Sequence, residues 1–242
     1  MSLTEHLEDL RRAVVRICII LTVSFFVTYA IGGEISEFLL VPLRKSLNPS
    51  AGDQVVYLGI LDKVLSQLQV SFWTSILLSS PVWFYQIWNF VKPGLHAHEI
   101  KAVRPFLLVG FFLFWCGVFF GYYVVFPVTV ATLLDFGVQN VAANIALKDY
   151  LVLTSQILVF LGLIFQVPNI LLILGFMGLV TKYSLREMRR YVYVGLSIFA
   201  AVITPPDVIT MMALWIPLVI LYEVGVVAVA LIVHPYLAKQ HG

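Results

Sequence analysis

The chain has 242 residues, of which 61% are hydrophobic and 12% are charged, with a mean hydropathy of +0.97. A soluble domain averages about 45–50% apolar and about 25% charged residues, so this composition predicts a protein embedded in a lipid bilayer. The net charge of +2 is too small to indicate nucleic-acid binding. The only two cysteines, Cys18 and Cys116, imply no disulfide framework, and their apolar surroundings predict buried, inert thiols.

Six apolar segments predict six membrane-spanning helices in a single domain that covers residues 1–242. A bilayer core requires about 20 helical residues, and the fifth segment has only about 14. We therefore expect the fifth and sixth segments, joined by the polar turn 204–207, to form a short hairpin that stops below the outer surface. The six segments are 13–32, 69–91, 105–127, 151–178, 191–204 and 208–233.

The distribution of positive charge predicts the orientation in the membrane. Eleven of the 15 Lys and Arg residues lie in the N-terminal segment, the second-to-third loop, the fourth-to-fifth loop and the C-terminal tail. Because cytoplasmic loops carry an excess of Lys and Arg, both termini are predicted to lie in the cytoplasm.

The first outer loop, about 33–68, has apolar residues at helical spacing between Glu34 and Leu47. This spacing predicts an amphipathic helix on the outer surface, followed by a second helix that begins near Asp62. The segment 128–150 is expected to form the second outer loop. Pro105 fits the first turn of a helix, where its missing N–H costs nothing.

Three prolines inside apolar segments, Pro81, Pro168 and Pro217, are expected to kink their helices. Kinks in several neighbouring helices favour a curved array of helices. Tolerated kinks in an ordinary helix bundle are the alternative.

Acidic residues near the start of the chain are candidates for binding a cation. Glu5 and Asp9 are four residues apart and share one helical face, and Glu8 is placed to pair with Arg12. Acids in a first helical turn also complement the helix dipole, which is the purely structural explanation. The functional alternative is that Asp9 stays free to receive a cation from another molecule.

Glu99 follows the aromatic stretch 81–90 in a short polar loop, and by composition it is a solvated surface acid. His96 and His98 lie beside it, but no further cysteine or histidine cluster supports a metal site, so none is predicted.

Two polar residues lie inside predicted spans. A carboxylate such as Glu223 costs at least ~2.5 kcal/mol in a membrane segment unless it is protonated, paired or facing water. Gln166 is uncharged and is expected to form a hydrogen bond to another helix. Asp207 is expected to be the N-cap of the sixth helix. The sequence contains no nucleophile–base pair and no phosphate-binding loop, so an enzyme is not predicted and no cofactor is expected.

Seven ordered motifs together resemble the TatC family, the multi-span core subunit of the twin-arginine protein translocase. These motifs are EHLEDLRR at 5–12, SSPVWFYQIWNFVKPGLHAHE at 79–99, GYYVVFP at 121–127, IFQVPNI at 164–170, REMRR at 186–190, TPPDV at 204–208 and IPLVILYEVG at 216–225.

The resemblance implies an all-helical membrane protein with six helices in a cup-like array. It further implies a bacterial or archaeal cytoplasmic membrane and a non-enzymatic receptor for signal peptides that carry two arginines. Asp9 and Glu99 match the two acids that recognise the arginine pair in the family. Asp9 stands where the family more often has glutamate, so its reach is one methylene shorter. The remaining candidate signal-peptide residues are Glu5, Arg11, Gln86 and Phe90.

The resemblance also implies partners and roles for the membrane-embedded residues. Single-span TatA/TatB-type subunits are expected to dock near Thr204, Pro205, Pro206 and Asp207, and the complex is expected to contain several copies and to use the proton gradient. Gln166 stands where the family often has glutamate, so it is expected to hydrogen-bond rather than to titrate. Glu223 matches the acid of the family's sixth helix.

Two other functions remain open on the residues alone. A small-solute secondary transporter would contain inverted repeats and broken helices that meet at the membrane midplane. No such repeat is visible in the sequence, and the six segments differ widely in length. An intramembrane enzyme is the other alternative.

Overall fold

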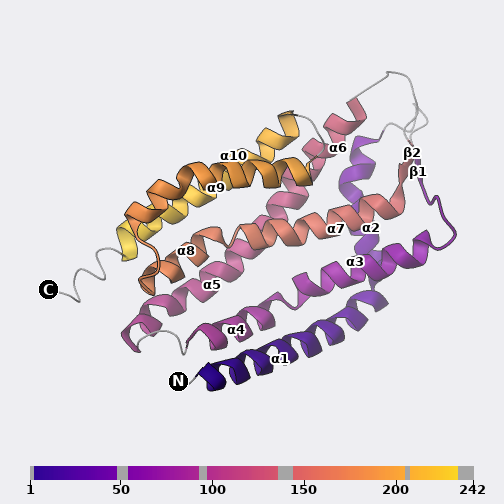
Figure 1. Ribbon diagram of the computed structural model, residues 1–242. Coiled ribbons are helices and arrows are strands. Elements are labelled where there is room, and N and C mark those ends of the chain that lie inside the picture. Colours follow the sequence, from indigo (N-terminus) through magenta and orange to yellow (C-terminus); the bar gives the residue numbers. More distant parts are fainter. Residues whose placement is uncertain (1–2, 48–53, 93–96, 136–143, 205–207, 234–242) are drawn as a thin grey trace. The chain divides into compact units, whose positions relative to one another are not determined.

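In a computed structural model the described residues form helices and one small two-stranded sheet (Figure 1). The structure describes residues 3–47, 54–92, 97–135, 144–204 and 208–233. The chain divides into two compact units, residues 1–94 with 121–160 and residues 95–120 with 161–242. The predicted all-helical class is thus confirmed.

The first unit is built around the long helix α1, which packs along α3 and α4 (Figure 1). Its two strands pair in parallel, with Gln54 opposite Asn144. Its elements are α1 (Leu3–Ala30), α2 (Gly32–Ser46), β1 (Gln54–Val56), α3 (Asp62–Leu78), α4 (Ser80–Val91), the π-helical turn η3 (Gly121–Val125), α6 (Phe126–Asp135), β2 (Asn144–Ala146) and α7 (Leu147–Ile164) up to residue 160.

The second unit combines one long helix with a hairpin. Helix α10 packs against both α8 and α9, and α5 packs against α8. Its elements are α5 (Ala97–Phe120), the last turn of α7, α8 (Val167–Phe176), α9 (Lys182–Ile203), α10 (Val208–Ala228) and the π-helical turn η4 (Val229–Val233).

Four helical segments in the described part of the chain are long and apolar enough to cross a membrane. They are Glu8–Ala30, Val103–Leu134, Leu147–Phe176 and Val208–Val233, and they correspond to four of the six predicted spans. The predicted span 69–91 is divided between α3 and α4, and the predicted span 191–204 is the apolar half of α9.

Proline interrupts two of the three helices in which a kink was predicted. Pro81 occupies the first turn of α4, after a break at Ser79, and Pro168 occupies the first turn of α8. At the first break the indole N–H of Trp83 donates to the carbonyl oxygen of Ile76 at 2.9 Å, which satisfies an acceptor at the end of α3. Pro217 lies inside the continuous helix α10.

The predicted amphipathic helix after residue 33 is present as α2, and α3 begins at Asp62 as predicted. Pro42 has no N–H to donate to the carbonyl of Phe38 within α2. The hydroxyl of Tyr122 donates to that carbonyl oxygen instead, at 2.7 Å, and the Tyr122 ring stacks on Phe38.

A second set of polar interactions in the first unit involves the start of α3. The Asp62 carboxylate accepts from the backbone N–H of Gly59 at 2.7 Å and pairs with Lys148 of α7 at 3.2 Å. The Gly59 N–H and the Lys148 ammonium together hold the pKa of Asp62 below its usual value. The Asp62 carboxylate is therefore charged at neutral pH and fixes the first turn of α3 to the start of α7.

The expectation that Pro105 lies in the first turn of a helix is wrong. Helix α5 begins at Ala97 rather than near 105, so Pro105 is an interior residue and not a first-turn residue. Pro105 is the ninth residue of α5, beyond the first turn, so it removes one N–H donor from the interior of the helix. Helix α9 begins at Lys182 because the Thr181 side chain caps it by accepting from the N–H of Ser184 at 3.2 Å.

Two further expectations fail. The expected outer loop 128–150 contains most of α6, strand β2 and the start of α7. Cys18 and Cys116 are free, as expected, but both are exposed rather than buried. Apolar runs in this chain cover its outer surface as well as its helix contacts, so an apolar neighbourhood in the sequence does not imply burial within the protein.

Glycines allow helices of the second unit to approach closely. A methyl group at Gly117 of α5 would lie 2.7 Å from the carbonyl oxygen of Leu161 and 2.7 Å from the ring of Phe165. A methyl group at Gly162 would lie 2.6 Å from the ring of Phe114. The contact of α5 with the region 161–165 therefore depends on the absence of side chains at both positions.

We expect Gly117→Ala to lower the free energy of unfolding by about 1–3 kcal/mol, because a backbone oxygen stands in the way of the added methyl group. Gly195→Ala on α9 is the matched control, since a methyl group there meets nothing within 4 Å. The control is expected to be neutral or to stabilise by about 0.5–1 kcal/mol. Thermal unfolding of both variants in detergent measures the difference, and an unchanged melting temperature for Gly117→Ala would contradict this packing.

Candidate functional site

Helix α1 presents two different faces near its start. Asp9, Ala13 and Ile17 are partly covered, whereas Glu8 and Arg12 are exposed. Residues four apart lie on one side of a helix, so the covered residues form a single face. Because α1 packs against α3 and α4, Asp9 lies on the packed face of α1, at its N-terminal end.

The two adjacent acids of α1 differ in their partners. Glu8 accepts a hydrogen bond from Arg12 at 2.6 Å, as predicted. Asp9 forms no ion pair with any residue in the described part of the chain. Of these two acids, Asp9 is therefore the one without a described partner, and its carboxylate is available to an external cation.

Helix α4 places two further candidates on one face. Trp83 and Phe84 are buried and their rings stack with centroids 4.2 Å apart. Gln86 and Phe90 follow Trp83 by three and seven residues, so they continue its face, and both are partly exposed. The packed start of α4 thus fixes the direction in which Gln86 and Phe90 project.

The other three signal-peptide candidates are Glu99, Glu5 and Arg11. Glu99 lies in the first turn of α5, in the second unit, rather than in a loop, and its side chain lies outside the described residues. The side chain of Glu5 lies outside them as well. Arg11 is exposed, and at about 100° per residue it projects from the side of α1 opposite Asp9. Asp9 and Arg11 therefore present their charges to different surroundings.

Gln166 occupies the break between α7 and α8. Its side-chain amide donates to the carbonyl oxygen of Gly110 on α5 at 2.9 Å, which confirms the predicted hydrogen bond between helices. Asn169 donates to the side-chain oxygen of Gln166 at 3.4 Å, and both residues are buried. A methyl group at Gly110 would collide with the amide of Asn169. This polar pair therefore depends on a glycine in the facing helix.

Glu223 is paired rather than isolated. One carboxylate oxygen accepts from Arg189 at 2.5 Å, and the other accepts from the hydroxyl of Tyr193 at 2.5 Å. Both partners belong to α9, so the acid joins the two helices of the α9–α10 hairpin. The ring N–H of Trp215 donates to the carbonyl of Tyr193, and the hydroxyl of Tyr222 donates to that of Leu185.

The expected partner-docking turn is described only at its first residue. Thr204 ends α9, is buried, and donates through its hydroxyl to the carbonyl of Ala200 at 2.8 Å. Pro205, Pro206 and Asp207 lie outside the described residues, as does the N-cap predicted for Asp207. Among the residues that the structure describes, no group of three His, Cys, Asp or Glu side chains could hold a metal ion.

The sequence analysis missed the partners of the membrane-embedded residues. Arg189 was used only for orientation and as part of the motif REMRR, and Tyr193 and Asn169 were not singled out. The predicted hairpin offered a usable signal, because Arg189 and Glu223 are nearly equidistant in sequence from the turn expected at 204–207. Two antiparallel helices joined there place these residues at similar depth.

Comparison with known proteins identifies the family. The family model described as "Sec-independent protein translocase protein (TatC)" matches residues 5–217. The chain belongs to the TatC family. The TatC protein of Desulforapulum autotrophicum is 35% identical over 224 residues, which cover 93% of this chain and 82% of that protein. The TatC protein of Escherichia coli K12 is 31% identical over 93% of this chain and 86% of its own length.

A solved structure agrees with this assignment. The crystal structure described as "Twin Arginine Translocase Receptor- TatC" superposes with a TM-score of 0.83 at 28% identity. It covers 93% of this chain and 98% of that one. The resemblance to the TatC family drawn from seven sequence motifs is therefore confirmed.

Proposed function

We propose that this TatC-family chain is the core receptor subunit of a twin-arginine protein translocase. It binds twin-arginine signal peptides at the cytoplasmic face of the membrane and catalyses no reaction itself. The observation that carries the proposal is the carboxylate of Asp9 on the packed face of α1, which has no ion-pair partner among the described residues, whereas the adjacent Glu8 pairs with Arg12. Asp9 and Glu99 receive the two guanidinium groups, with Glu5, Arg11, Gln86 and Phe90 around them.

The energetics assign the carboxylates a selective role. A hydrogen bond to a charged group contributes about 1.5–3 kcal/mol when it is partly buried, so two carboxylates supply at most about 6 kcal/mol. Micromolar affinity requires about 8.2 kcal/mol. The apolar stretch of the signal peptide supplies the remainder by contact with the helices, while the acids choose the register and select arginine.

The proposed arrangement has six membrane-spanning helices in one cup-like domain, with both termini in the cytoplasm. Support comes from the excess of Lys and Arg on one side and from the similarity to the solved TatC structure. In addition to the four long apolar segments, the proposal counts α3 with α4 as one crossing and the apolar half of α9 as another. The host membrane is the bacterial or archaeal cytoplasmic membrane.

Partner subunits of the single-span TatA/TatB type dock at the turn formed by Thr204, Pro205, Pro206 and Asp207, and several copies of the complex assemble. Gln166 and Glu223 contribute to assembly or transport rather than to peptide binding. Gln166 cannot titrate, so proton-gradient coupling does not pass through a carboxylate at that position. The family comparison gives no support to the alternative of a small-solute transporter.

The experiment that tests the proposal compares peptides carrying two arginines with peptides carrying two lysines. A planar guanidinium binds a carboxylate through two parallel hydrogen bonds, which an ammonium cannot do. We expect the two-lysine peptide to bind at least about tenfold more weakly, as one lost charge-assisted bond predicts. Site-directed crosslinking of a twin-arginine precursor to the wild-type receptor and to the Glu99→Ala variant tests the same contact between guanidinium and carboxylate. Equal binding of both peptides would refute the recognition model.

A further inference from the structure

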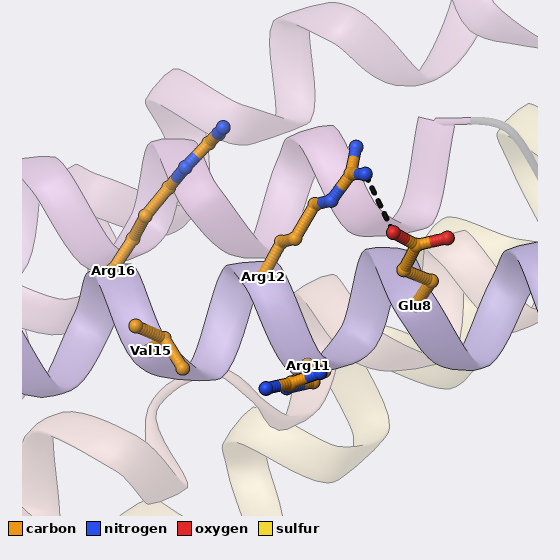
Figure 2. Close-up of a pocket in the computed structure, with 5 residues that line it drawn as sticks. All are labelled: Glu8, Arg11, Arg12, Val15 and Arg16. Atoms are coloured by element: carbon orange, nitrogen blue, oxygen red, sulfur yellow. Dashed lines mark hydrogen bonds and ion pairs between the residues drawn. The ribbon is translucent and has the colours of Figure 1, made fainter.

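An open pocket of about 360 Å³ lies on the outward side of α1 (Figure 2). Figure 2 shows Arg12 and Arg16 extending in the same direction from successive turns of the helix, with Val15 and Arg11 at the opposite edge of the helix as drawn. The lining residues are Glu8, Arg11, Arg12, Val15 and Arg16. Of these five residues, the proposed signal-peptide site uses only Arg11.

The pocket carries excess positive charge. Three arginines face one glutamate, so its net charge is +2. The single ion pair, Arg12 with Glu8, joins side chains that are 62% and 60% exposed, and such a pair contributes little to stability. Arg16 forms no ion pair with any described residue. Arg12 and Arg16 are therefore both able to bind an anion from outside the chain.

An exposed apolar stripe continues directly from these arginines along α1. Val15, Ile19, Val23 and Phe26 recur at helical spacing, and all four are at least half exposed. The segment from Val15 to Val23 is about 12 Å long, close to the ~15 Å of hydrocarbon in one bilayer leaflet. A phosphate-sized anion at the arginines would thus lie at the head of a surface suited to an acyl chain.

We propose that this face of α1 is a binding site for an anionic phospholipid. The phosphodiester bridges Arg12 and Arg16, and one acyl chain lies along Val15, Ile19 and Val23. Guanidinium groups one helical turn apart match phosphate oxygens bidentately. The proposed signal-peptide site uses neither Arg12 nor Arg16, and two unshared arginines favour an anion over a second cationic peptide. The site therefore differs from the signal-peptide site, and the inference does not depend on the proposed function.

The test measures retention of added lipid by the purified full-length protein in a neutral detergent, using native mass spectrometry. Phosphatidylglycerol is compared with phosphatidylcholine carrying the same acyl chains. We expect wild type to prefer phosphatidylglycerol and the double variant R12Q/R16Q to lose about 30-fold in apparent affinity, the effect of two arginines near an anionic surface. Arg44→Gln is the matched control, since Arg44 is an exposed, paired arginine on α2.

The outcomes distinguish the possible occupants. Loss of phosphatidylglycerol binding in the double variant but not in Arg44→Gln supports the site, as does partial recovery in R12K/R16K. Equal retention of both lipids by wild type, or unchanged binding in a double variant with native circular dichroism, overturns it. Displacement by millimolar inorganic phosphate would indicate a free-phosphate site instead. A change in oligomeric mass without a change in lipid binding would indicate a second copy of the chain.

Discussion

Asp9→Asn is expected to weaken binding of a twin-arginine signal peptide by about tenfold or more. The substitution removes the charge that would accept from a guanidinium, and a hydrogen bond to a charged group contributes about 1.5–3 kcal/mol when partly buried. Asp9 is partly covered on the packed face of α1, so solvent screens it less than it screens its neighbour Glu8. Titration of a labelled signal peptide against receptor in detergent or nanodiscs measures the dissociation constant.

Glu8→Gln provides the control for this variant. It removes the same charge from the adjacent residue, but Glu8 is exposed and already paired with Arg12. We expect its dissociation constant to stay within about twofold of wild type, as for most exposed ion pairs. If Glu8→Gln weakened peptide binding as much as Asp9→Asn, the general negative charge of the segment would explain recognition, and the assignment of Asp9 would fail.

The second large effect is expected at the α9–α10 hairpin. Glu223→Gln leaves the guanidinium of Arg189 without its counter-charge in a partly buried position, where the Arg189 and Glu223 side chains are only 39% and 30% exposed. Losing a charge-assisted hydrogen bond there should cost about 1.5–3 kcal/mol. We expect a lower melting temperature and reduced co-purification of single-span partner subunits, with signal-peptide binding unchanged.

A double-mutant cycle separates the pair from its surroundings. Arg189→Gln combined with Glu223→Gln removes both charges, so the double variant should be more stable than the sum of the two single losses predicts. Arg44→Gln breaks the exposed Arg44–Glu37 pair and should change stability by less than about 1 kcal/mol. Additive losses in the cycle would mean that the pair does not couple the two helices. Loss of peptide binding with normal assembly would reverse the role given to Glu223.

The composition and the apolar segments were sufficient to predict an all-helical membrane protein, and four of the six predicted segments coincide with long apolar helices. Boundaries next to proline were less predictable. Pro105 was predicted to lie in the first turn of a helix, yet α5 extends eight residues before it and accommodates the proline in its interior, with the loss of one N–H donor. Pro42 lies inside α2, where Tyr122 satisfies the carbonyl that the proline leaves without a donor.

For the candidate site, sequence spacing predicted the pairs that are local along the chain and failed for those that are distant. The Glu8–Arg12 pair is one helical turn apart and follows from periodicity alone. The pairing of Glu223 with Arg189 spans 34 residues and depends on the register of the hairpin, which composition does not encode. Gln166 was predicted to bond to another helix, but the acceptor at Gly110 required the packing of α5.

Five of the hydrogen bonds between segments share one asymmetry. Trp83, Tyr122, Gln166, Trp215 and Tyr222 each donate a side-chain hydrogen to a main-chain carbonyl of another segment. A main-chain acceptor persists whatever side chain its residue carries, so these contacts constrain evolution at the donor end alone. Substitution of Ile76, Phe38 or Leu185 leaves the carbonyl acceptor in place. Substitution of the aromatic donor removes the hydrogen bond.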